Sequence, residues 1–263
     1  MNKYWVSVVG LVSLLFSTSA TFATTDNYIE LKSRAGVILP IYVIQPEKPV
    51  ATVILLPGGN GIIKLGPGGP EKEGNFLVRT RNHFAENNLM TIVMDAPSDL
   101  QERKKGLKGK RMTNENLADI KAIVDYARKQ ANIPVWLVGT SRGTISATYV
   151  ASREPNLVNG IVLTSTVSSS GKKGADSVMD VALEKITVPV LLVHHKHDNC
   201  NVSPASGIKK IADRLNNAKL VETKQFDGGK EKNGKECAGF SYHGYFKIED
   251  GVVSSISDWI KSH

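Results

Sequence analysis

Short apolar runs that alternate with amphipathic segments restrict the fold of this chain more than any other feature of its sequence. Runs such as residues 53–56 and 190–193 are apolar throughout, which is typical of strands buried on both faces. Between such runs, apolar residues recur at helical spacing, for example across residues 117–127. Because parallel strands need crossover connections, the alternation predicts a doubly wound, mostly parallel eight-stranded sheet with helices on both faces.

The expected elements follow from these patterns. The strands are residues 28–33, 37–44, 53–56, 91–94, 133–138, 161–163, 190–193 and 220–221, with a turn at Ala35 and Gly36 joining the first two. The helices are residues 76–86, 117–127 and 144–153, one that opens at Ser203 and Pro204, and a last one with Val252, Val253, Ile256, Trp259 and Ile260 on one face. The polar stretch of residues 168–187 leaves room for one short helix at 176–185 and for no large lid.

Residues 1–23 have the pattern of a secretory signal peptide. Lys3 precedes an apolar run at residues 4–16, and small residues follow as far as Ala20 and Ala23. The run is short for a membrane span, so we expect cleavage after Ala20 or Ala23, with an uncleaved anchor as the alternative. Residues 24–263 then form a single domain, in the periplasm or outside the cell, with no stable membrane span.

The balance of charge is positive but does not identify a partner. The formal net charge is +8, and loss of Lys3 with the signal peptide leaves +7. No module that interleaves basic and aromatic residues is present, so nucleic-acid binding is not supported. The basic stretch at residues 103–111 could attract an anionic substrate, although a solvated loop is the favoured interpretation.

A Gly-x-Ser-x-Gly motif lies between an expected strand and an expected helix. In Gly139-Thr140-Ser141-Arg142-Gly143, the two glycines let strand and helix approach closely while Ser141 projects from the edge of the sheet. An ordinary glycine and serine turn is the alternative for the motif alone. Its flanking elements favour a nucleophile at the edge where the carboxyl ends of parallel strands bind ligands.

A serine nucleophile needs a base and a carboxylate that orients the base. Asp198 follows the apolar run at 190–193, and His243 precedes the last helix, so the chain order is Ser, Asp, His. Alternatively, Asp198 caps the helix that opens near Ser203, and His243 is a structural histidine. Order and loop position together favour a catalytic triad of Ser141, Asp198 and His243.

The glycine-rich loop after residue 56 suits an oxyanion hole. In Pro57-Gly58-Gly59-Asn60-Gly61, the main chain can approach a carbonyl oxygen closely. We expect one N–H donor from Arg142 and another from Gly59 or Asn60. The loop lacks the lysine and the Ser/Thr of a phosphate-binding loop, so we expect no cofactor.

The two cysteines and the histidine cluster have structural interpretations. An even cysteine count in an exported chain suggests a disulfide between Cys200 and Cys237, which would tie the Asp198 loop to the His243 loop. His194, His195 and His197 beside Asp198 could suggest zinc. Alternate strand residues face opposite sides, so the four side chains should not converge, and no metal site is expected.

With these motifs, the chain resembles an α/β-hydrolase, specifically the lidless, dienelactone-hydrolase-like secreted members, from Tyr28 to the C-terminus. The resemblance implies that Ser141 is the nucleophile, His243 the general base and then acid, and Asp198 the orienting carboxylate. Ser141 replaces the cysteine of true dienelactone hydrolases, and Pro57 stands where many esterases have histidine. Both departures concern the substrate rather than the fold.

The expected activity is hydrolysis of carboxylic esters or thioesters through an acyl-enzyme, on a small-molecule or acyl-bearing substrate, with an anionic one left open. The alternatives are a peptidase or acyltransferase with the same triad, and a catalytically silent binding protein of the same fold. Without a lid, the pocket should be open and suited to short-chain or accessible esters.

Overall fold

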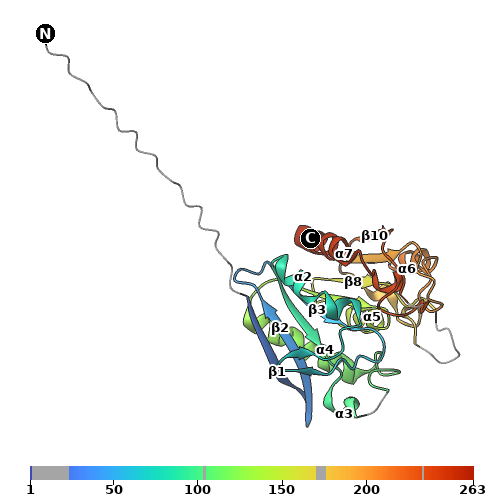
Figure 1. The fold of residues 1–263 in the computed structure, drawn as a ribbon. Helices are drawn as coiled ribbons and strands as arrows, with labels where there is room; N and C mark the ends of the chain where they lie inside the picture. The colour runs from blue at the N-terminus through green and yellow to red at the C-terminus, as the bar shows by residue number, and fades with distance from the viewer. Residues whose placement is uncertain (2–23, 103–104, 170–175, 233) are drawn as a thin grey trace.

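The computed structural model describes Met1 and residues 24–102, 105–169, 176–232 and 234–263 (Figure 1). The predicted signal peptide and two cations of the basic stretch, Arg103 and Lys104, therefore lie outside the described residues. No helix in the described part of the chain is long and apolar enough to cross a membrane.

An eight-stranded sheet runs through the molecule, as expected. Its strands are β1 (Thr25–Arg34), β2 (Val37–Gln45), β3 (Ala51–Leu56), β6 (Leu89–Met94), β7 (Val135–Thr140), β8 (Gly160–Thr164), β9 (Val190–His195) and β10 (Val221–Phe226). Their order in space is β1-β2-β6-β3-β7-β8-β9-β10. The pairs β1–β2 and β2–β6 are antiparallel and the rest are parallel, which confirms the mostly parallel sheet. A hairpin of β4 (Leu65–Gly66) and β5 (Gly69–Pro70) forms a separate two-stranded sheet that contacts β2.

The helices cover both faces of the sheet. They are α1 (Phe76–Arg79), α2 (Arg81–Glu86), α3 (Ser98–Gln101), α4 (Asn114–Gln130), α5 (Gly143–Arg153), α6 (Gly207–Arg214) and α7 (Glu249–Ser262), with 3-10 turns η1 (Val178–Asp180), η2 (Leu183–Lys185) and η3 (Tyr242–Gly244). Alternate residues of one strand belong to two separate cores, because successive side chains point to opposite faces. Ile54 and Leu56 pack with α4, α5 and α6, whereas Val53 and Leu55 pack with α1, α2 and α7.

Three helix predictions need correction. The expected helix 76–86 is split at Thr80, whose hydroxyl donates a 2.8 Å hydrogen bond to the carbonyl of Phe76. The expected helix around 176–185 consists of the two short turns η1 and η2. Ser203 and Pro204 do not open a helix, because α6 begins at Gly207 and Ser203 is used elsewhere, as described below.

Candidate active site

Ser141 lies on a tight turn between β7 and α5, in the predicted strand–turn–helix context. Its φ of 51° is in the left-handed region that non-glycine residues seldom adopt. A Cβ on Gly139 would lie 2.7 Å from the carbonyl oxygen of Gly143, and a Cβ on Gly143 would overlap the carbonyl of Leu56. Glycine is thus required on both sides of the serine. The Ser141 N–H donates to Thr164 at 2.9 Å, which holds the turn against β8.

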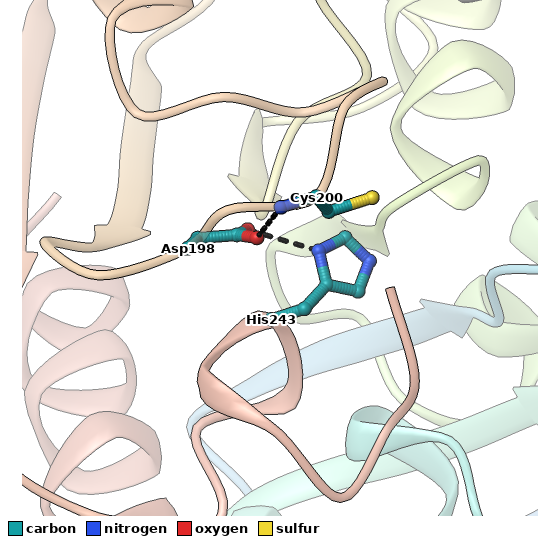
Figure 2. Close-up of side chains that lie close together, drawn as sticks. All are labelled: Asp198, Cys200 and His243. Carbon is teal, nitrogen blue, oxygen red and sulfur yellow. Dashed lines mark hydrogen bonds and ion pairs between the residues drawn. The ribbon is translucent and has the colours of Figure 1, made fainter. Parts of the chain in front are cut away.

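Asp198 and His243 meet at the same edge of the sheet, although they are far apart in sequence. Asp198 follows β9, His243 lies in η3, and both side chains are buried. Asp198 Oδ2 lies 2.9 Å from His243 Nδ1 (Figure 2). A carboxylate can only accept, so Nδ1 carries the proton, and Nε2 on the other side of the ring keeps its lone pair.

Hydrogen bonds keep the Asp198 carboxyl ionised. Burial alone would raise its pKa, but hydrogen bonds with His194 and His243 outweigh burial and lower the pKa of Asp198 to about 2. His194 Nε2 lies 3.3 Å from Oδ2, and the Cys200 N–H donates to Oδ1 at 3.0 Å. Asp198 therefore does not cap α6, and it presents a fixed negative charge to His243.

Two residues of this network were missed in the sequence. Ser203 Oγ lies 3.0 Å from His243 Nδ1, and His194 Nε2 lies 2.9 Å from the Ser203 carbonyl oxygen. Of the four side chains expected not to converge, His194 does meet Asp198, because the chain leaves the strand after His195 and turns back, with the Asp198 N–H donating to the His195 carbonyl at 3.1 Å. Strand alternation does not apply beyond the end of the strand.

Hydrogen bonds of two buried side chains, Ser165 and Tyr245, hold the turn that carries His243. Ser165 Oγ donates to the His243 carbonyl at 2.7 Å. The buried Tyr245 hydroxyl donates to the Val193 carbonyl at 2.9 Å, and burial raises the pKa of Tyr245. The imidazole is thus anchored through its backbone to the ends of β8 and β9.

A disulfide joins Cys200 to Cys237, as predicted. It connects the segment after Asp198 with the segment before His243. Ligand atoms of Asp198, Cys200 and His243 lie within 4.8 Å of one another. The Cys200 sulfur is bonded to Cys237, however, so it is not the thiolate that a metal ion would bind. His195 instead contacts the Gly228 carbonyl at 2.8 Å through Nε2.

The glycine-rich loop forms a tight turn beside Ser141. The Gly61 N–H donates to the Gly58 carbonyl at 3.1 Å, and Gly59 has a φ of 61°. A Cβ on Gly58 would lie 3.0 Å from both the Ser141 Cβ and the Thr140 carbonyl oxygen, so glycine lets this loop pass close to the serine turn. Asn60 Oδ1 accepts the Ile62 N–H at 3.1 Å, within the same loop.

Arg111 supports this loop from inside the molecule, which corrects the solvated-loop interpretation for this residue. Its side chain is only 2% exposed. The guanidinium donates to the carbonyls of Pro57 at 2.9 Å and Gly59 at 3.4 Å, and to Ser146 Oγ on α5 at 3.2 Å. Burial, and to a smaller extent nearby Arg142, lowers the pKa of Arg111 to about 9, so the side chain remains charged at neutral pH.

One pocket contains the candidate nucleophile and the candidate base. Its volume is about 330 Å³, and both Ser141 and His243 line it. Gly58 and Gly59 of the expected oxyanion loop also line it, whereas Asn60 and Arg142 do not. The rest of the lining is Ile62, Ile63, Lys72, Gly74, Asn75, Phe76, Thr140, Cys237, Gly239, Phe240 and Gly244.

The fold with its strand order and its serine turn is that of the α/β-hydrolases. Solved structures that resemble the chain include the dienelactone hydrolase from Anabaena variabilis ATCC 29413, with 14% identity, 91% of this chain and 98% of that chain covered, and a TM-score of 0.67. Est1E from Butyrivibrio proteoclasticus has 16% identity and a TM-score of 0.60, and the match covers 89% of this chain and 97% of that chain.

A serine hydrolase without a lid from Xanthomonas campestris has 13% identity and a TM-score of 0.58, and the match covers 94% of this chain and 98% of that chain. No protein-family model and no curated protein matches the sequence. Identities this low establish the fold alone, and they confirm the resemblance at that level.

Proposed function

We propose that this chain is a serine hydrolase that cleaves carboxylic esters or thioesters through an acyl-enzyme. One observation carries the proposal. The strained Ser141 and the base of the Asp198–His243 pair line the same pocket, at the carboxyl edge of the sheet. The α/β-hydrolase fold is consistent with this chemistry but does not by itself specify it.

The proposed reaction needs a nucleophile, a base and donors for the oxyanion. Ser141 Oγ attacks the carbonyl carbon while His243 Nε2 takes the hydroxyl proton. The N–H groups of Arg142 and of Gly59 or Asn60 bind the oxyanion. The tetrahedral adduct then breaks to the acyl-enzyme, and His243 gives its proton to the departing alcohol or thiol. Water deprotonated by His243 hydrolyses the acyl-enzyme and releases the carboxylic acid.

The pocket favours small substrates with an apolar part. Ile62, Phe76 and Phe240 supply apolar surface, and the exposed Lys72 supplies a cation at the same pocket. Est1E has also been solved with ferulic acid bound, an aromatic carboxylic acid. We therefore propose short or aryl esters as substrates, including anionic ones. A peptidase or acyltransferase would use the same machinery.

Steady-state and burst kinetics test the proposal. Purified protein without residues 1–23 should hydrolyse nitrophenyl esters of increasing acyl length with a burst of one equivalent of nitrophenol. Ser141→Ala should abolish both phases, while Ser206→Ala, an exposed serine before α6, should not. Peptide amides in parallel separate esterase from peptidase. A folded, oxidised protein that hydrolyses no ester or amide would favour the silent binding protein.

Export is part of the proposal. The N-terminal pattern and the Cys200–Cys237 disulfide both suit an oxidising compartment. N-terminal sequencing of protein from the periplasm or medium should begin at Thr21 or Thr24. Intact Met1 on exported protein would contradict cleavage.

A further inference from the structure

Asn75 lies at the start of α1 with its side-chain orientation fixed. Its Oδ1 accepts the Leu77 N–H at 3.1 Å and so caps the helix. In a planar amide, a hydrogen bond at Oδ1 also determines where Nδ2 points. The cap therefore holds the two N–H bonds of Nδ2 in one direction.

The amide nitrogen lies close to Ser141. A Cβ on Gly58 would lie 3.0 Å from the Ser141 Cβ and 3.3 Å from Asn75 Nδ2. The Cβ would also lie 3.0 Å from the Thr140 carbonyl oxygen, so Ser141 and the Asn75 amide nitrogen both lie close beside the α-carbon of Gly58. Asn75, Gly58 and Ser141 all line the 330 Å³ pocket.

The N–H groups of Asn75 Nδ2 can donate hydrogen bonds to a ligand. Among the described residues, Asn75 has a hydrogen bond at Oδ1, and none of its side-chain hydrogen bonds starts from Nδ2. Nδ2 is also absent from the buried polar atoms that lack a partner in the described chain. Nδ2 is therefore not sealed inside the protein, and because Asn75 lines the pocket, a substrate oxygen bound there can accept its N–H bonds.

We infer that Asn75 Nδ2 donates a hydrogen bond to the carbonyl oxygen of an acyl group bound at Ser141, and holds the oxyanion that forms from it. This inference rests on the proposed hydrolase function. It adds a side-chain donor to the two backbone donors expected from the sequence. A side-chain amide suits this role because it is neutral and donates strongly to developing negative charge.

The size of the effect follows from removing one such donor. Loss of a single oxyanion donor lowers kcat by about 100- to 1000-fold in a well-studied serine protease. Here two backbone donors remain, so we expect a fall of roughly 10- to 100-fold in kcat, with a smaller change in KM.

Two substitutions separate the donor from the helix cap. Asn75→Ser and Asn75→Asp both keep an oxygen that can accept the Leu77 N–H, and both remove the amide donor. We expect both variants to unfold at the wild-type urea midpoint while kcat falls. Asn75→Asp should be the slower, because its carboxylate repels the oxyanion. Asn82→Ser, at an exposed asparagine of α2, is the matched control and should leave kcat unchanged.

The rate of phosphonylation by a fluorophosphonate gives a second readout, because the phosphonyl oxygen occupies the oxyanion position. It should fall in parallel with kcat. Wild-type rates in Asn75→Ser and Asn75→Asp would overturn the inference while leaving the hydrolase intact. A wild-type protein that neither hydrolyses esters nor reacts with the probe would overturn both.

Discussion

Replacing Arg111 with methionine should lower kcat while changing the folding free energy only a little. The side chain holds the carbonyls of Pro57 and Gly59 from inside, and both belong to the turn beside Ser141. In Arg111→Met, these carbonyls lose their donor, so the turn can relax and its N–H groups shift away from the oxyanion position. We expect a fall in kcat of roughly 10- to 100-fold, comparable to losing part of an oxyanion hole.

The change in folding free energy should be small because two large effects oppose each other. Burial, and to a smaller extent Arg142, lowers the pKa of Arg111 from 12.5 to about 9, which corresponds to a penalty of several kcal/mol on the buried charge. Methionine removes that penalty. It also leaves the Pro57 carbonyl and Ser146 Oγ without their donor, at about 1–3 kcal/mol each. The loss and the gain are of the same order, so the net change should lie within about 3 kcal/mol of zero.

Urea unfolding and ester kinetics on the same samples measure both quantities. Lys108→Met is the matched control, because Lys108 belongs to the same basic stretch but is exposed. The control should leave kcat unchanged. An Arg111→Met protein with wild-type kcat would refute the idea that this side chain holds the oxyanion loop. A loss of activity that only tracks unfolding would refute it equally.

Three further predictions concern the acid and base loops. Hydrogen bonds with His194 and His243 hold the pKa of Asp198 at about 2, below the ordinary 3.8, so the ionised carboxylate stabilises the fold by about 2 kcal/mol above pH 4. The stability difference between wild type and Asp198→Asn should shrink as the pH falls from 4 to 2, and a constant difference in urea unfolding would contradict this. His194→Leu should lower kcat more than KM, because leucine has no donor to replace the contacts of Nε2 with both Asp198 and Ser203; unaltered kinetics would show that Asp198 is held without it. Mild reduction should lower kcat before the protein unfolds, because the Cys200–Cys237 bond ties the Asp198 loop to the His243 loop. Thiol titration confirms that the disulfide is reduced. Full activity in the reduced, folded protein would exclude a positioning role for the disulfide.

Features that depend on local pattern could be predicted from the sequence. The six inner strands are largely apolar and buried, so their bounds were identified within two residues, whereas the polar edge strand β10 was expected only at 220–221 and extends to Phe226. The glycines at 139 and 143 indicated a tight turn around Ser141, and the structure shows that a Cβ at either position would meet backbone atoms. The order Ser, Asp, His pointed to Asp198 and His243, which lie 2.9 Å apart.

Features that depend on a distant partner could not be predicted in this way. Ser203 followed by proline has the pattern of a helix start, but its hydroxyl lies against His243, 40 residues away in sequence. Arg111 belongs to a run of basic residues, and only its burial under residues 57–59 distinguishes it. Asn75 preceded an expected helix, so capping was foreseeable, whereas its position opposite Gly58 required the fold.

A fluorophosphonate probe followed by peptide mass mapping tests the central claim most directly. The probe forms a bond from a nucleophilic serine oxygen to phosphorus and releases fluoride. We predict one adduct per chain, located at Ser141, and its loss in Ser141→Ala. Its formation should also slow strongly in His243→Ala, because the proposed mechanism assigns removal of the serine proton to His243. An adduct at another serine, or none on the folded and oxidised protein, would contradict the proposed catalytic site.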